Sequence, residues 1–307
     1  MIQLGNASAP KWFGLRVDRV DAYVDQLISF GASSTELVLH HGPSDERNER
    51  VHVQEHDWAT ITSTFQARNL HCNLHASLAP AFSLRRWAFE PKRLQAVYRP
   101  LLRFGAELAQ RHGTTRVLVV HAANAKEKTT EQNAQATSEF LDWALEESTA
   151  LGGGLNYSIE LRHDGEVTRE RFDTDRAMLK RFVASVGDQR VGICWDIGND
   201  LQQSLLNKVA PAPPGASFFP LVNHVHVHGR SAFGDMHNPI GPTDVSVNRY
   251  LESLAAANYS GSVTLEIRYR LAAAQGQPMA ILGRSYRLAA EALGIQRGTS
   301  PTGESRP

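Results

Sequence analysis

Eight short runs rich in β-branched and other apolar residues recur along the chain, and this repetition constrains the fold more than any other feature. The runs are residues 2–5, 34–40, 70–77, 116–123, 156–162, 190–199, 223–229 and 262–268. The stretches between them show helical periodicity, and several close on a glycine, as in 17–32, 94–113, 131–154 and 247–261. This alternation predicts parallel strands joined by right-handed crossovers. Eight such units favour a closed (β/α)8 TIM barrel over an open sheet, and no G-x-G-x-x-G follows the first run to support a dinucleotide-binding sheet.

The length of the chain suits one barrel. At 307 residues it needs no second domain, and we expect a single domain over residues 1–295. Residues 296–307 are polar and lack apolar periodicity, so we expect a disordered tail there.

Composition argues against several classes of partner. Basic and acidic residues balance at 32 each, and the basic ones form no long block, which argues against nucleic acid and anionic membranes as partners. The two cysteines, Cys72 and Cys194, lie in apolar runs without C-x-x-C spacing, as is typical of a reducing compartment. The first residues lack the pattern of a secretory leader, and no apolar run reaches the length of about eighteen residues that a membrane span needs. We therefore expect a cytoplasmic protein.

The run "NHVHVHGR", residues 223–230, places histidines at every second position. Successive side chains of a strand point to opposite faces, so His224, His226 and His228 project to one side and the intervening valines to the other. If that side faces solvent, the run is an ordinary polar edge. If it faces the interior, the three imidazoles need partners, and a metal or an anionic ligand is expected.

Chemically active side chains recur where the predicted strands end, which is the end at which barrel enzymes build their sites. Any one of them alone is explained by a structural hydrogen bond or a helix cap. Carboxylates and imidazoles that converge on one rim would repel one another and lose hydration unless a cation holds them, and this mixture of oxygen and nitrogen donors suits a divalent ion. The converging residues are His75, His121, Glu160, Asp196, His226 and Glu266.

The fifth and eighth strands repeat one arrangement, "IELR" and "LEIR". A spacing of two places Glu160 beside Arg162, and Glu266 beside Arg268, on the same face. One interpretation is a pair of internal ion pairs that hold the strands in register. The other is that the arginines position the glutamates or bind an anionic group of a substrate, because guanidinium pairs well with carboxylate and phosphate.

These residues resemble the xylose isomerase-like TIM barrels, a family of sugar isomerases and epimerases that also includes apurinic endonucleases of the endonuclease IV type. The resemblance extends over nearly the whole barrel, and it is most specific in residues 223–268, where the strand-end histidine, the later D-x-H, the "IG" and the final "SGSVTLE" follow the family's order. It implies a principal metal site formed by Glu160, Asp196, His226 and Glu266. It further implies additional ligands of the endonuclease-like, multi-metal branch at His75, His121, Asp235 and His237. The flanking His224 and His228 would then orient His226 or contact the substrate.

One position departs from the family pattern. Both branches commonly carry D-x-x-H after the sixth strand, whereas this chain reads "DIGN" and has Asn199 at the histidine position. Asparagine can hydrogen-bond a substrate hydroxyl but is a poor zinc ligand. The departure counts against a full three-metal centre and also against the usual free-sugar geometry.

The resemblance and the donor set together favour a divalent-metal isomerase or epimerase that acts on a sugar or related polyhydroxy carbonyl compound through an enediolate. Glu160 and Glu266 would remove and return the proton, and Arg162, Asn199, His228 and Arg268 would contact a small substrate, including an anionic one. The alternatives are a multi-metal phosphodiester hydrolase of the endonuclease IV type, and a metal-dependent lyase such as a dehydratase or decarboxylase. Histidine ligation favours Mn, Zn or Co over Mg. The sequence leaves a homo-oligomer open.

Overall fold

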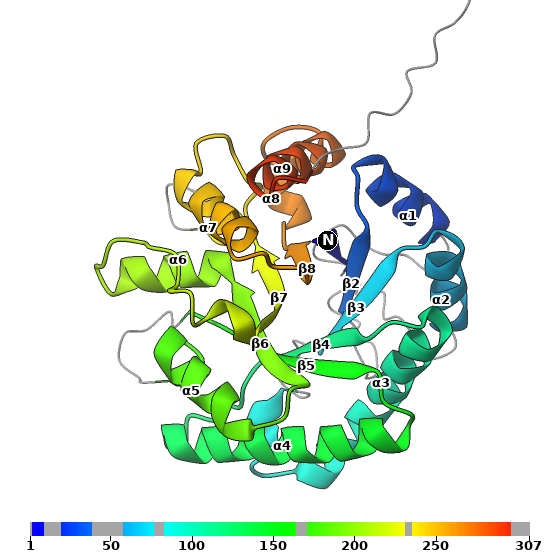
Figure 1. Ribbon diagram of the computed structural model, residues 1–307, viewed down its shortest axis with the longest axis vertical. Coiled ribbons are helices and arrows are strands. Elements are labelled where there is room, and N and C mark those ends of the chain that lie inside the picture. The colour runs from blue at the N-terminus through cyan, green and yellow to red at the C-terminus, as the bar shows by residue number, and fades with distance from the viewer. Residues whose placement is uncertain are drawn as a thin grey trace, which may run out of the picture.

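Eight parallel strands close into a barrel in the order of the sequence, and helices surround them (Figure 1). The structure is a computed structural model that describes residues 2–8, 20–38, 58–76, 83–163, 171–230 and 235–295. The strands are β1 (Gln3–Ser8), β2 (Ser34–Val38), β3 (His71–His75), β4 (Arg116–Val120), β5 (Leu155–Glu160), β6 (Val191–Asp196), β7 (Val222–Val227) and β8 (Ser262–Leu265). The pairing of β1 with β8 closes the ring, so the predicted (β/α)8 TIM barrel is confirmed.

The helices form the outer ring in Figure 1, with α3 and α4 side by side. They are α1 (Val20–Ser29), α2 (Trp58–Ala67), α3 (Pro91–His112), α4 (Thr130–Ala150), α5 (Arg176–Val186), α6 (Ile197–Leu206), α7 (Val245–Ala256), α8 (Tyr269–Ala273) and α9 (Pro278–Ala292). Among the described residues, two short 3-10 helices, η5 (Leu84–Arg86) and η6 (Phe219–Leu221), lie in connections. No helix in the described ranges is both long and apolar enough to cross a membrane.

Local signals in the sequence set where the helices begin and end. The helix α3 begins at Pro91, whose missing N–H costs nothing there, and it stops at Gly113, which adopts a left-handed conformation with φ 61°. The helix α4 begins after Thr129, whose side chain accepts from the Gln132 N–H while the Gln132 side chain accepts from the Thr129 N–H. This reciprocal capping box satisfies two backbone donors that the helix leaves unpaired.

Several strands end earlier than the sequence pattern predicts, and the sixth shows why. The run 190–199 was expected to be extended throughout, but β6 stops at Asp196 and α6 begins at the next residue. The Asp196 side chain accepts a hydrogen bond from the Asn199 N–H at 2.8 Å and so caps the helix. Apolar residues such as Ile197 satisfy either structure, so the pattern alone placed the boundary too late. The tail 296–307 lies outside the described residues.

Alternation along β7 sorts its side chains between two environments. Val225 and Val227 belong to the apolar core between the strands and the helices. His224 and His226 instead contact Glu36 of β2, which does not pair with β7, so these contacts cross the barrel interior. The prediction that the histidines share one face is confirmed for His224 and His226, and that face points inward. A barrel interior this polar requires a partner for every buried donor and acceptor.

Candidate metal centre and active site

The rim residues predicted from the sequence converge at the carboxyl ends of the strands. They lie within one residue of the ends of six consecutive strands, β3 to β8, and in that order they are His75, His121, Glu160, Asp196, His226 and Glu266. His121 keeps some exposure, and the other five are buried. The barrel closure thus brings together groups that are up to 191 positions apart in the sequence.

Glu160 is the centre of the hydrogen bonding in this group. Its Oε2 lies 2.7 Å from His121 Nε2 and 3.3 Å from His75 Nε2, and its Oε1 accepts from Asn199 Nδ2 at 3.2 Å. Burial alone would raise the pKa of the Glu160 carboxyl. The neighbouring His121, His75 and His226 outweigh burial and hold that pKa well below its ordinary value, so Glu160 is a carboxylate.

Glu266 has a different environment although it faces the same imidazole. Its Oε1 lies 3.6 Å from His226 Nδ1, while Glu160 Oε2 lies 4.0 Å from that nitrogen. Burial, together with the negative charges of Glu160 and Asp196, raises the pKa of Glu266 to about 7 against the opposing effect of His226. One histidine nitrogen therefore lies between two carboxyl groups, Glu160 with a lowered pKa and Glu266 with a raised pKa.

Asp196, Asn199 and His228 form the side of the site next to α6. Asn199 Nδ2 donates to Asp196 Oδ2 at 2.8 Å as well as to Glu160, so one amide ties two carboxylates together. His228 Nε2 lies 3.4 Å from Asp196 Oδ1. A Cβ added at Gly198 would stand 1.9 Å from the His228 ring, so the glycine of "DIGN" leaves the space that this imidazole occupies.

The arrangement fits a divalent cation. Within the described residues, His226 Nδ1 and His228 Nε2 are buried without a hydrogen-bond partner, although each lies within 4 Å of carboxylate oxygen. Burial would lower the pKa of His226, yet Cys194, Glu266 and Glu36 raise it well above its ordinary value, so the site stabilises positive charge at this position. Nitrogen and oxygen donors within 4.8 Å of one another occur in three overlapping sets at the rim. These sets are His75–His226–Glu266, His75–His121–Glu160 and Glu160–Asp196–His226.

The remaining predicted site residues lie at varied distances from this cluster. Arg162 Nη1 is 3.1 Å from His121 Nδ1, and His237 Nδ1 is 3.6 Å from Glu266 Oε2. The Arg268 N–H donates to the His237 carbonyl, which ties the end of β8 to the loop that carries His237. Asp235 is exposed and belongs to none of the donor sets found among the described residues.

Sequence reasoning missed Glu36, which is fully buried in the middle of β2. Its Oε2 lies 2.7 Å from His224 Nε2 and 3.0 Å from His226 Nε2. Burial would raise the pKa of Glu36, but His226 and His224 hold it far below its ordinary value. The available signal was a lone acidic residue inside an otherwise apolar or small strand, "STELV", because a buried strand tolerates a carboxylate only with partners.

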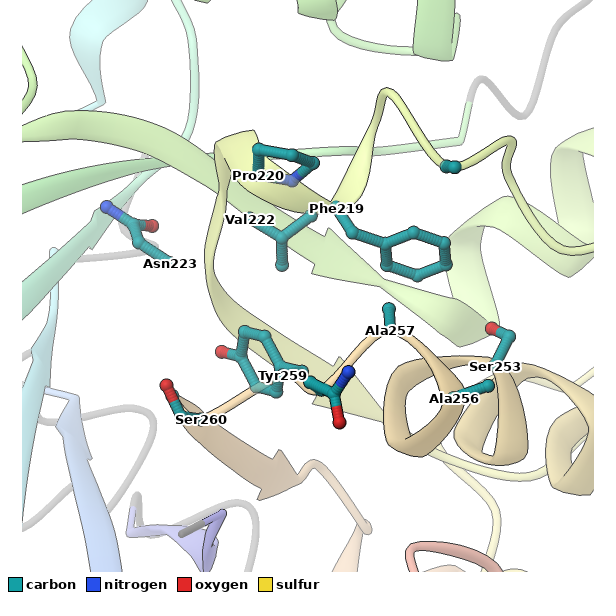
Figure 2. A pocket seen from close by; sticks show the side chains of 12 residues that line it. Phe219, Pro220, Val222, Asn223, Ser253, Ala256, Ala257, Tyr259 and Ser260 are labelled. Carbon is teal, nitrogen blue, oxygen red and sulfur yellow. The ribbon is translucent and has the colours of Figure 1, made fainter.

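The described residues also line a separate, open pocket at the opposite end of the barrel. It is about 750 Å³ and lies between α7, η6 and the beginnings of β7 and β8. Figure 2 shows Phe219, Val222 and Tyr259 among its lining side chains. The pocket is mostly apolar, and it lies away from the rim carboxylates. It therefore supplies no part of the site built by the strand ends.

Comparisons with known proteins agree with the fold. Among solved structures, the D-allulose 3-epimerase of Methylomonas sp. superposes with a TM-score of 0.65 at 14% identity, over 95% of each chain. The D-psicose 3-epimerase of Clostridium cellulolyticum H10 gives 0.68 at 12% identity, over 95% of this chain and 98% of that one. The 3-keto-D-glucoside 4-epimerase of E. coli gives 0.66 at 13% identity, over 95% and 100%. At such identities these likenesses establish the fold alone.

A search of curated protein sequences found no match. The sequence profile of one family, described as xylose isomerase-like TIM barrel, matches residues 24–289. That span begins in α1 and ends in α9, so it includes seven of the eight strands and all six rim residues. The chain therefore belongs to the xylose isomerase-like TIM barrel family.

Proposed function

We propose that the protein is a divalent-metal-dependent isomerase or epimerase acting on a sugar or related polyhydroxy carbonyl compound. The observation that carries the proposal is the pair of buried carboxyl groups, Glu160 and Glu266, which approach one histidine nitrogen from different strands. Epimerisation next to a carbonyl requires one group to remove a proton from one face of the carbon and a second to return a proton to the other face. The likeness to several sugar epimerases supports the same reaction class.

Four residues would hold the cation: Glu160, Asp196, His226 and Glu266. When bound, a divalent ion would polarise the substrate carbonyl and its neighbouring hydroxyl and so lower the cost of the enediolate. Nitrogen donors among the ligands favour Mn, Zn or Co. The chain's own residues then supply the proton transfers through Glu160 and Glu266, while Asn199 keeps the Glu160 and Asp196 carboxylates in fixed relative positions.

The substrate would be a small molecule that enters at the rim. Arg162, held beside His121, offers a guanidinium to a hydroxyl or to an anionic group, and we propose the same role for Arg268. His228, set against Gly198, would orient Asp196 and contact the substrate from the α6 side. Both cysteines are free and buried, which supports a cytoplasmic location.

The test measures the exchange of carbon-bound hydrogen in the substrate for deuterium from the solvent. Protein loaded with Mn²⁺ is incubated in D₂O with ketohexoses such as D-allulose, D-tagatose and D-fructose, and NMR monitors loss of the C–H signal and appearance of the epimer. We expect exchange at the carbon next to the carbonyl, reduced by at least about 100-fold in Glu160→Gln and Glu266→Gln. The exposed Glu252→Gln on α7 is the matched control and should keep full activity. Unchanged exchange in both site variants would remove the proposal.

A second candidate, a multi-metal phosphodiester hydrolase, has one observation in its favour. His75, His121 and Glu160 form a second donor set beside the first. Against it, the Asn199 amide donates both to Glu160 and to Asp196, so it offers no ligand nitrogen where the family commonly has histidine. Incubation of the Zn²⁺-loaded protein with an abasic-site duplex discriminates, because only the hydrolase incises the strand. A lyase on the same scaffold would instead give a dehydrated or decarboxylated product in the sugar assay.

A further inference from the structure

We infer that Glu36, inside the barrel below the rim, is the positioning residue that fixes which nitrogen of His226 faces the metal site. The inference rests on the proposed metal site and concerns how this chain prepares it. Glu36, His224 and His226 are each 0% exposed, so no solvent can serve their polar atoms from outside the protein. The hydrogen-bonding state of each group must therefore be set by its protein neighbours.

The first hydrogen bond involves the backbone N–H of Val117, which can only donate. The Val117 N–H donates to Asn73 Oδ1 at 3.0 Å, so this side-chain atom must be the oxygen of the amide. The other amide atom, Nδ2, then donates to Ser262 Oγ at 2.8 Å. The Ser262 hydroxyl accepts this bond through one of its two lone pairs, and it lies 2.7 Å from His224 Nδ1, to which it can donate its hydrogen.

The next step passes through His224. His224 Nε2 lies 2.7 Å from Glu36 Oε2, and a carboxylate at that distance favours the neutral tautomer that carries its hydrogen on Nε2. The opposite tautomer would direct a nitrogen lone pair at a buried carboxylate, which is repulsive. The Glu36 carboxylate therefore selects this tautomer, and the Ser262 hydroxyl is compatible with it because it can donate to His224 Nδ1.

Glu36 transmits this arrangement to the metal site. A carboxylate only accepts, so His226 Nε2, 3.0 Å from Glu36 Oε2, must also carry a hydrogen. The other nitrogen, Nδ1, is thereby left to face Glu266 and Glu160, and it has no hydrogen-bond partner among the described residues. A carboxylate that accepts from the distal nitrogen of a metal-ligating histidine fixes its orientation and increases its basicity. Sequence separation hides this link, because Glu36 and His226 are 190 positions apart.

The first experiment measures metal affinity, independently of any sugar. Metal-free protein is titrated with Mn²⁺ against a fluorescent chelator. We expect Glu36→Gln to weaken binding by about 10-fold to 100-fold, because an amide presents a donor to one of the two imidazoles and forces a tautomer change. Glu36→Asp, which keeps the carboxylate, should bind with intermediate affinity. Ser262→Ala, which acts two groups away from His226, should weaken binding less than Glu36→Gln.

Matched controls separate positioning from general loss of stability. Thr35 is the buried neighbour of Glu36 on β2, and its hydroxyl donates to the Asn6 carbonyl at 3.0 Å. Thr35→Val should lower thermal stability and leave the Mn²⁺ affinity unchanged. If Glu36→Gln binds Mn²⁺ as tightly as the natural protein, or if Thr35→Val weakens binding equally, the inference is wrong.

A second experiment reads the tautomer directly and covers the case in which Glu36→Gln fails to fold. The natural protein, labelled with ¹⁵N-histidine and loaded with diamagnetic Zn²⁺, should show His226 with its hydrogen on Nε2 and Zn²⁺ on Nδ1. A metal bound at Nε2 would overturn the inference. So would two equivalents of Zn²⁺ that fall to one in Cys194→Ser, because Cys194, His224 and His226 would then form a deeper metal site. Neither readout depends on activity, so an inactive but correctly coordinated protein would disprove only the proposed sugar reaction.

Discussion

Gly198 shows how one missing side chain shapes the site. Any Cβ at this position would lie 1.9 Å from the His228 ring, far inside contact distance. We predict that Gly198→Ala displaces His228 from Asp196 and costs about 1–3 kcal/mol of unfolding free energy, as overpacking usually does. Urea denaturation checks the stability, and Mn²⁺ titration checks the site. Gly215→Ala is the matched control, since a Cβ there meets nothing within 4 Å, and equal losses in both variants would contradict the prediction.

His71, at the start of β3, predicts a pH dependence of stability. Burial foremost, and then the charge of Arg116, lower its pKa to about 3, whereas an unfolded histidine titrates near about 6.5. The unfolded state therefore binds the proton first. The stabilising contribution of neutral His71 is fully present above about pH 6.5 and is lost as the pH falls towards 3.

We accordingly expect unfolding free energy to fall more steeply between about pH 7 and 4 in the natural protein than in His71→Asn. Urea denaturation at several pH values gives both slopes. Because other buried histidines titrate in both proteins, only the difference between the slopes bears on His71, and equal slopes would contradict the prediction.

At the scale of elements, the capping box of α4 contributes to the stability of the fold and has no part in the metal site. Thr129 satisfies one end of a helix that packs on α3 and carries no rim residue. We predict that Thr129→Ala lowers the unfolding free energy by about 1 kcal/mol, because a helix N–H loses its partner, while Mn²⁺ affinity stays constant. Glu146→Ala, on the exposed face of the same helix, should change stability by less than about 0.5 kcal/mol. Chemical denaturation of both variants measures the two changes in unfolding free energy, and equal losses would contradict the prediction.

At the scale of the whole molecule, metal binding should stabilise the barrel. The proposed ligands lie in β5, β6 and β7 and directly after β8, so a cation joins strands that are otherwise linked through the sheet. A ligand that binds only the folded state at about 100 times its Kd adds about 2.7 kcal/mol. We therefore expect Mn²⁺ to raise the Tm of chelator-treated protein in a concentration-dependent manner, and the shift to shrink in Glu266→Gln. No shift with saturating Mn²⁺, Zn²⁺ or Co²⁺ would refute the metal site.

The sequence by itself determined the architecture and the identity of the six residues at the rim. Eight alternating strand and helix signals can close in few ways, because parallel strands need crossovers of one hand. Strand parity also placed the three histidines of 223–230 on one face, and the structure shows His224 and His226 inside the barrel and His228 beside Asp196 just after the strand ends. These are local properties, and they can be read from spacing alone.

Only the tertiary structure decided which of these groups meet and what state they adopt. Where β6 ends depends on a side-chain cap at Asp196, which competes with the strand pattern. The buried role of Glu36 and the different proton affinities of Glu160 and Glu266 depend on contacts between strands far apart in sequence. Burial and neighbouring charge are properties of the closed barrel and of no single segment. The sequence could therefore predict which residues carry the chemistry, but not which of them contact one another or how their pKa values shift.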